Sequence, residues 1–196
     1  DNVAKNNGFK PLHSSKTDYQ KIDIIKFKKN NEGIDKCVFI DNKIQFCNGI
    51  RYHDHLVKIP AAILSKLSRV LIIGGGDGQL VDCLLKYPDI KRIDVIEIDK
   101  SMMKIMKTHY DQSLFPTDDR VSIVVGDAMD LIDTTPNKLY NLIIVDVDKE
   151  FLEKKSLNNI NFLRICSRKL DVHNNMLIKK FCNPGCPNEH PRELWF

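Results

Sequence analysis

The alternation of short β-branched runs with helical segments constrains the fold of this chain more than any other feature. The runs cover residues 69–73, 92–98, 121–125, 141–145 and 175–181, and the candidate helices between them cover residues 79–86, 100–110 and 157–170. Strands that are fed by crossover helices predict a parallel sheet in an α/β domain. Ligands of such sheets bind at the carboxyl ends of the strands, so we expect functional residues directly after the runs.

The segment before this alternation predicts a separate β element. Turn signals separate three short runs at residues 22–27, 36–40 and 43–46. Such runs predict a small antiparallel element, and apolar residues at helical spacing over residues 56–67 predict a first helix. Polar, aperiodic residues further upstream predict a flexible tail. The expected organisation is therefore a tail (1–16), an N-terminal β element (17–49) and an α/β domain (50–196).

The composition excludes several classes of protein. The chain has 196 residues, of which 42% are hydrophobic and 29% are charged, and these values are typical of a globular protein. The net charge of +4 is spread without long basic runs, so we expect no nucleic-acid partner. The sequence contains no apolar stretch of ~20 residues and no signal-peptide pattern, so we expect no membrane association and a cytoplasmic location. The six scattered cysteines are expected to be reduced thiols.

Acidic residues occur at the ends of four predicted strands. The first strand leads into Gly-Gly-Gly-Asp-Gly at residues 74–78, and the next three lead into Glu97, Asp127 and Asp146. Glycines permit a tight turn and close backbone approach, and the next helix offers unpaired N–H groups to a ligand. Because Gln79 replaces the last glycine of the dinucleotide fingerprint and Asp77 would repel a pyrophosphate, the pattern disfavours a dinucleotide. The alternative is a loop that only links strand to helix.

Two of these carboxylates indicate a nucleoside site. Glu97 ends its strand about 20 residues beyond the glycine-rich loop, where a carboxylate accepts both hydroxyl groups of a ribose. Asp127 follows the third strand at a position suited to an adenine amino group. Its alternative role is to cap the next helix.

These motifs resemble those of the class I S-adenosylmethionine-dependent transferases and, within that superfamily, those of the spermidine and spermine synthases. Residues 18–22 resemble the family's Tyr-Gln opening of an amino-terminal hairpin, residues 41–45 its Asp-Gly-x-x-Gln turn, and residues 52–56 its Tyr-His-Glu segment. Residues 74–78 reproduce the family's glycine-rich loop, and residues 95–99 and 126–128 complete the set. The resemblance extends from about residue 17 to about residue 183.

The resemblance implies a fold and a reaction. The fold would be α/β, a Rossmann-like class I transferase sheet with a small N-terminal β-hairpin element. The reaction would be aminopropyl transfer from decarboxylated S-adenosylmethionine, as co-substrate, to a polyamine, with release of methylthioadenosine and without a metal. Spermidine is the favoured acceptor and putrescine the second, and the family implies a homodimer.

The resemblance also assigns roles to residues. The donor side comprises Gln20, Gly74, Gly76, Asp77, Gly78, Glu97, Asp127 and Ala128. The acceptor side comprises Tyr52, His53, Asp77, Asp148 and Glu193. Asp146 is the candidate base that takes the proton of the attacking amine, and its alternative role is to cap a turn. Asp77 would attract the free amine of the decarboxylated donor and repel the carboxylate of intact S-adenosylmethionine.

The chain departs from the family pattern near its carboxyl end. Spermidine synthases carry a second Asp three residues after the first, whereas here Lys149 has that spacing and Asp148 precedes it. Residues 193–195 (Glu-Leu-Trp) resemble the carboxyl end of spermine synthases and favour that branch. The stretch before them is short, so we expect a domain that is shortened at its carboxyl end. The alternatives to an aminopropyltransferase are a methyltransferase and a catalytically silent paralogue that only binds or dimerises.

Overall fold

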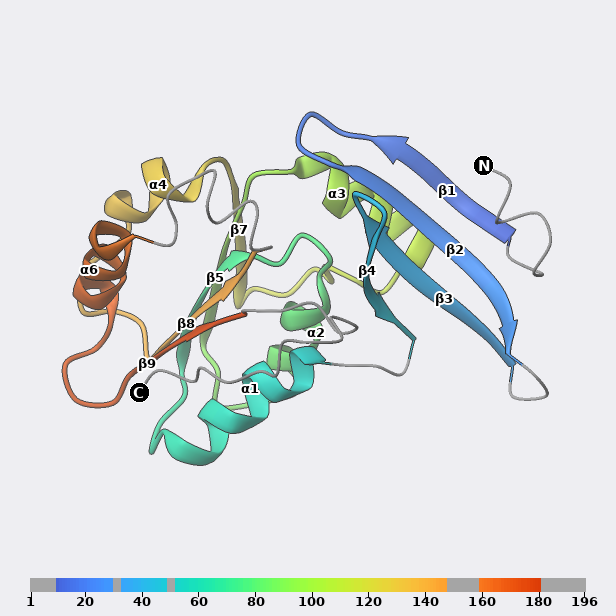
Figure 1. Cartoon of the computed structure of the whole chain (residues 1–196). Helices are drawn as coiled ribbons and strands as arrows, with labels where there is room; N and C mark the ends of the chain where they lie inside the picture. The colour runs from blue at the N-terminus through green and yellow to red at the C-terminus, as the bar shows by residue number, and fades with distance from the viewer. Residues whose placement is uncertain (1–9, 30–32, 49–51, 148–158, 181–196) are drawn as a thin grey trace.

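The chain forms an antiparallel sheet and a parallel sheet, which lie next to each other (Figure 1). The computed structural model describes residues 10–29, 33–48, 52–147 and 159–180. Within these ranges, the first sheet has four strands and the second has five. The predicted fold class, an α/β domain with a parallel sheet and a small N-terminal β element, is confirmed.

The antiparallel sheet consists of β1 (Lys10–Lys16), β2 (Lys21–Lys29), β3 (Gly33–Ile40) and β4 (Lys43–Cys47), in that order. Alternate residues of β2 and β3 are buried on one face, among them Ile22, Ile24 and Val38. These side chains pack against α3 (Lys100–Ile105) and η1 (Met106–Tyr110), a helix that continues α3 with π-type hydrogen bonds. This contact joins the antiparallel sheet to the rest of the protein.

The predicted boundary of the amino-terminal tail is wrong. Residues 10–16 belong to β1, and they pair with β2 with Ser15 opposite Ile22. The sequence Lys-Pro-Leu-His-Ser-Ser-Lys lacks the β-branched alternation of a strand, but an edge strand takes its hydrogen bonds from the neighbouring strand. Residues 1–9 lie outside the described part, and the other domain boundaries stay predictions.

The parallel sheet has the order β7 (Val121–Val125), β6 (Arg92–Glu97), β5 (Arg69–Gly74), β8 (Leu142–Asp146) and β9 (Met176–Lys179). Every residue of β8 is buried, and Val70, Leu71 and Ile72 of β5 are fully buried. Such continuous β-branched runs are typical of central strands covered on both faces. The strands predicted from the sequence agree closely with these five.

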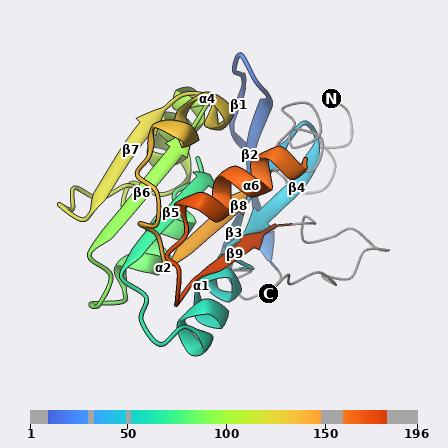
Figure 2. The same cartoon turned by 90° about the vertical axis from the view of Figure 1, so that its left-hand side faces the viewer.

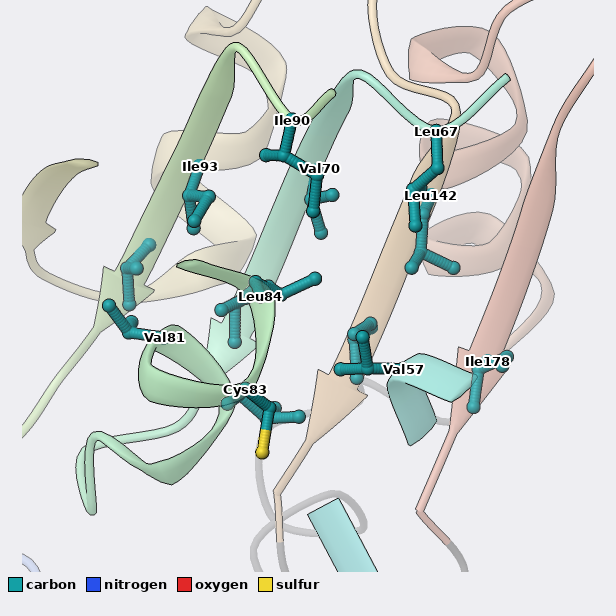
Figure 3. Close-up of a cluster of buried hydrophobic side chains, with 14 of the residues drawn as sticks. Val57, Leu67, Val70, Val81, Cys83, Leu84, Ile90, Ile93, Leu142 and Ile178 are labelled. Atoms are coloured by element: carbon teal, nitrogen blue, oxygen red, sulfur yellow. The ribbon is translucent and has the colours of Figure 1, made fainter. Parts of the chain in front are cut away.

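Helices cover both faces of the parallel sheet. One face packs on α1 (Tyr52–Ile63) and α2 (Gln79–Leu85) through a cluster that includes Val57, Leu84 and Ile178 (Figure 3). The other face packs on α4 (Ala128–Leu131), η2 (Ile132–Thr134) and α6 (Ile160–Lys169), and Figure 2 shows α6 lying across it. The predicted helix over residues 56–67 is shifted, since α1 spans Tyr52–Ile63. No helix in the described ranges has the length and apolar character needed to cross a bilayer.

The prediction that all cysteines are reduced thiols is wrong for one pair. Cys37 of β3 and Cys47 of β4 lie directly opposite each other and form a disulfide. Cys83 and Cys166 are free thiols, and both are buried. Cys182 and Cys186 lie outside the described residues. The cytoplasmic location and the homodimer stay predictions.

Candidate active site

A cavity borders the carboxyl edge of the parallel sheet, where the alternation of strands and helices predicts the functional residues. The ends of β5, β6 and β8 contribute to its wall, as do Gln20 and Gln45 from the antiparallel sheet region. The predicted site residues that line it are Gln20, Tyr52, Gly74, Gly76, Asp77, Glu97, Asp127, Ala128 and Asp146. Asp148 and Glu193 lie outside the described residues.

The glycine-rich loop brings the backbone against two acidic residues. Gly74 ends β5 opposite Asp146 of β8, and its φ of +85° is a left-handed conformation that favours glycine. A Cβ atom on Gly74 would collide with the carbonyl oxygen of Asp146, and one on Gly76 would lie 2.8 Å from Glu97 Oε2. Glycine at both positions therefore allows this close approach. Gly78 serves as the N-cap of α2.

Glu97, at the end of β6, is a buried carboxyl group with a strongly shifted pKa. Its Oε1 accepts a hydrogen bond of 2.7 Å from the backbone N–H of Asp99. Burial, helped by the charges of Asp99 and Asp77, raises the pKa of Glu97 to about 7, although the N–H groups of Asp99 and Gly76 favour the carboxylate. Such a group changes its charge near neutral pH.

Asp99 connects this edge of the parallel sheet to the amino-terminal region. Its Oδ1 accepts the N–H of Met102 at 3.0 Å and caps α3. Its Oδ2 accepts the hydroxyl of Thr17 at 2.7 Å and the amide of Gln20 at 3.2 Å. Gln20 is thus held at the cavity by Asp99, a carboxylate for which no role was predicted from the sequence. The signal for Asp99 was its position at the same strand end as Glu97.

Asp127 has the capping role that was considered for it, and it also lines the cavity. Its side chain accepts the backbone N–H of Met129 at 3.0 Å and thereby caps α4. The same residue lines the cavity next to Ala128. An N-cap interaction fixes the side chain at the position where the sequence predicts a contact with a base.

His53 lies between two buried carboxylates. Its Nε2 is 2.9 Å from Asp77 Oδ2 and 3.7 Å from Asp146 Oδ2, and the side chain is 1% exposed. Burial opposes protonation of the ring, but the charges of Asp77 and Asp146 outweigh this effect and raise the pKa of His53 above 6.5. Burial likewise disfavours ionised Asp77, but His53 and the N–H of Gln79 lower the pKa of Asp77 below 3.8. His53 and Asp77 thus stabilise each other as imidazolium and carboxylate.

Tyr52 and Lys180 complete the polar side of the cavity around Asp146. The Tyr52 hydroxyl donates to Asp146 Oδ1 at 3.3 Å and accepts from Lys180 Nζ at 3.0 Å. Lys180 Nζ also lies 3.5 Å from Asp146 Oδ1. No role was predicted for Lys180, although it lies near the end of the last predicted run (175–181), at the same sheet edge as the acidic residues.

The cluster of His53, Asp77 and Asp146 also has the composition of a metal site. Each residue offers one ligand atom, and these atoms lie within 4.8 Å of one another. In the structure, however, Asp77 is paired with His53 and Asp146 lies beside Lys180. A divalent cation at this cluster would have to displace both contacts.

Comparison with known proteins identifies similar sequences. A family model described as the spermine/spermidine synthase domain matches residues 49–181. A polyamine aminopropyltransferase of Clostridium perfringens (strain SM101) is 34% identical over 164 residues, which are 81% of this chain and 56% of that protein. One of Clostridioides difficile (strain 630) is 33% identical over 166 residues, which are 82% of this chain and 56% of that protein. The chain thus spans little more than half the length of these relatives.

Solved structures show the same fold. A spermidine synthase in complex with the transition-state analogue AdoDATO superposes with a TM-score of 0.71 at 23% identity, over 82% of this chain and 55% of that chain. The spermidine synthase of Thermotoga maritima gives a TM-score of 0.69 at 23% identity, over 82% of this chain and 54% of that chain. The likeness covers most of this chain and about half of each solved structure.

Proposed function

Because the chain belongs to the spermine/spermidine synthase family, we propose that its cavity transfers an aminopropyl group from decarboxylated S-adenosylmethionine to an amine acceptor. The observation that carries this proposal is that Asp77 and Asp146 share one cavity with Glu97. One bound pair of substrates could then contact Glu97 through the ribose of the donor, and Asp77 and Asp146 through amino groups.

The donor side fits an adenosine group. Ionised Glu97 would accept the ribose hydroxyls, and Gly76 leaves the space in front of Glu97 Oε2 that any Cβ atom would fill. Asp127 and Ala128 would contact the adenine. Gln20, held by Asp99, would close the donor from the side of the antiparallel sheet.

The acceptor side supplies a place for the leaving proton. Asp146 would accept the proton from the attacking ammonium, because a protonated amine has no lone pair. The neutral nitrogen then attacks the methylene carbon beside the sulfonium, the C–S bond breaks, and its electron pair stays on sulfur as a neutral thioether. The Tyr52 hydroxyl donates to Asp146 Oδ1, and the charge of His53 lies 3.7 Å from Asp146 Oδ2, so both neighbours would orient the carboxylate before the reaction.

Asp77 gives the site a preference between two donors. The carboxylate of Asp77 lies in the cavity with its charge stabilised by His53. It would attract the free ammonium of the decarboxylated donor and repel the carboxylate of intact S-adenosylmethionine. A methyltransferase would gain nothing from this repulsion.

Two observations favour different polyamine acceptors. The Glu-Leu-Trp segment at residues 193–195 resembles spermine synthases and favours spermidine as acceptor, but it lies outside the described residues. The two solved structures compared above are spermidine synthases, which favours putrescine and gives no support to a closer relation to spermine synthase. We propose a polyamine acceptor and leave the choice between the two to the assay.

The test is incubation of the protein with labelled decarboxylated S-adenosylmethionine and either putrescine or spermidine. We expect methylthioadenosine and one labelled, longer polyamine, and the better acceptor is the one with the higher kcat/KM. Formation of neither product would contradict the proposal. Tighter binding of intact than of decarboxylated S-adenosylmethionine would instead favour a methyltransferase.

A further inference from the structure

We propose that Lys180 is a resident ammonium group at the acceptor-binding position, and that it lowers the affinity of the cavity for amines with several charges. This inference rests on the proposed function, since it concerns the amine-binding side of the same cavity. Lys180 lines the cavity together with Asp146 and Tyr52.

The backbone of Lys180 is fixed by the parallel sheet. It directly follows β9, and its N–H donates to the carbonyl oxygen of Val145 at 2.9 Å. This hydrogen bond continues the pairing of β9 with β8, which ends in Asp146. The sheet register therefore sets Lys180 next to the candidate base.

The side chain of Lys180 is surrounded by groups that recognise an alkylammonium. Its Nζ lies 3.0 Å from the Tyr52 hydroxyl, and 3.5 Å from both Asp146 Oδ1 and Gln45 Oε1. It also lies 4.7 Å from the centroid of the Tyr52 ring. The side chain is 8% exposed. A carboxylate, neutral oxygen acceptors and an aromatic face are the contacts that a polyamine nitrogen would use here.

Among the residues that the structure describes, the charges around the acceptor side are consequently close to balance. The carboxylates of Asp77 and Asp146 face two cationic groups, His53 and Lys180. An entering ammonium must therefore share Asp146 with Lys180 or displace it. A second ammonium on the same acceptor adds repulsion, so the penalty grows with the charge of the acceptor.

The neighbouring residue Lys179 provides a matched control. Successive residues of a strand point to opposite faces of a sheet. Ile178 packs on the face of α1 and α2, whereas Leu177 packs on the face of α6, so Lys179 shares the face of Leu177. A change of Lys179 to Gln removes the same formal charge on the other side of the sheet.

The test is calorimetric titration of putrescine and spermidine into the protein saturated with methylthioadenosine, at one pH and ionic strength. We expect Lys180→Gln to bind both amines at least tenfold more tightly, with the larger gain for spermidine. Lys180→Arg, which keeps the charge, and Lys179→Gln should stay within about twofold of the unmodified protein. Unchanged binding in Lys180→Gln, or an equal gain in Lys179→Gln, would overturn the inference.

A second measurement needs no variant, and it decides the matter if Lys180→Gln does not fold. In the unmodified protein, 4-aminobutanol, which carries one ammonium, should bind within about threefold of putrescine, which carries two. A preference of tenfold or more for putrescine would overturn the inference. Titration of methylthioadenosine alone separates this inference from the proposed function. If methylthioadenosine does not bind, the result counts against the proposed nucleoside site. The effect of Lys180 can then still be measured by titrating the amines into the protein without methylthioadenosine.

Discussion

At the scale of single residues, the proposed chemistry depends most directly on Asp146. Its carboxylate lies in the cavity and contacts Tyr52, His53 and Lys180. We expect Asp146→Asn to lower kcat at least ~100-fold, because the amide cannot take the proton from the amine. The affinity for methylthioadenosine should change less than about twofold.

The control for this variant is Asp130→Asn, which neutralises an exposed carboxylate on α4. Its kcat should equal that of the unmodified protein. A kcat of Asp146→Asn close to the unmodified value, measured by release of methylthioadenosine, would reject Asp146 as the base.

Glu97 predicts a pH dependence of nucleoside binding. Its pKa is about 7. The ionised carboxylate can accept hydrogen bonds from both ribose hydroxyls on its two oxygens, whereas in the protonated form one oxygen carries a hydrogen. Affinity for methylthioadenosine should therefore rise about tenfold between pH 6 and pH 8. Glu97→Gln should bind weakly and without this pH dependence, and equal slopes in the two proteins would contradict the assignment.

At the scale of the elements, the contact between the antiparallel sheet and α3 is the packing on which the cavity depends. Ile24 of β2 is fully buried in this contact. We expect Ile24→Ala to lower the free energy of unfolding by about 2–5 kcal/mol, measured by urea denaturation. Ile25→Ala, on the other face of β2 where the side chain is half-buried, should cost less than half as much.

The sequence predicts the central elements better than the peripheral ones, for physical reasons. The runs that form β5, β6 and β8 are rich in β-branched residues, as is typical of strands that are covered on both faces. Their sequence pattern therefore identifies them as strands without ambiguity. β1 carries no such pattern, because its pairing with β2 comes from the partner strand. α1 begins at Tyr52, earlier than the apolar spacing indicates, because its first turn carries the polar residues Tyr52, which lines the cavity, and His53, which is paired with Asp77.

The site could be predicted where a residue of clear chemical type stands at the end of a predicted strand. Asp77, Glu97, Asp127 and Asp146 follow strands, and the structure brings all four to one cavity. Lys180 was not predictable in this way, since a lysine at a strand end usually reaches solvent. Its burial depends on the position of Tyr52, which is far away in the sequence.

At the scale of the whole molecule, two buried groups predict how stability depends on pH. The pKa of Glu97 is raised from 4.5 to about 7, and that of His53 is raised above 6.5. The folded state therefore binds protons that the unfolded state has lost, so stability present at low pH is lost as the pH rises through the folded values. Asp77 acts in the opposite direction, but only below pH 3.8.

We therefore expect the free energy of unfolding of the ligand-free protein to be lower at pH 8 than at pH 5. The contribution of Glu97 corresponds to about 3 kcal/mol, and urea denaturation at the two pH values measures it. Glu97→Gln should remove most of this difference. A higher stability at pH 8 than at pH 5 would contradict the buried, protonated state of Glu97.

The hydrogen bonds from Thr17 and Gln20 to Asp99 have a consequence for protein engineering. Asp99 is the N-cap of α3 at the edge where Glu97 lies, so one carboxylate serves both the amino-terminal sheet and the proposed nucleoside side. A chimaera that grafts the first hairpins of a relative onto this chain would separate these partners. Such a graft should keep its adenosine affinity only when the recipient's loop after β6 is exchanged together with the hairpins.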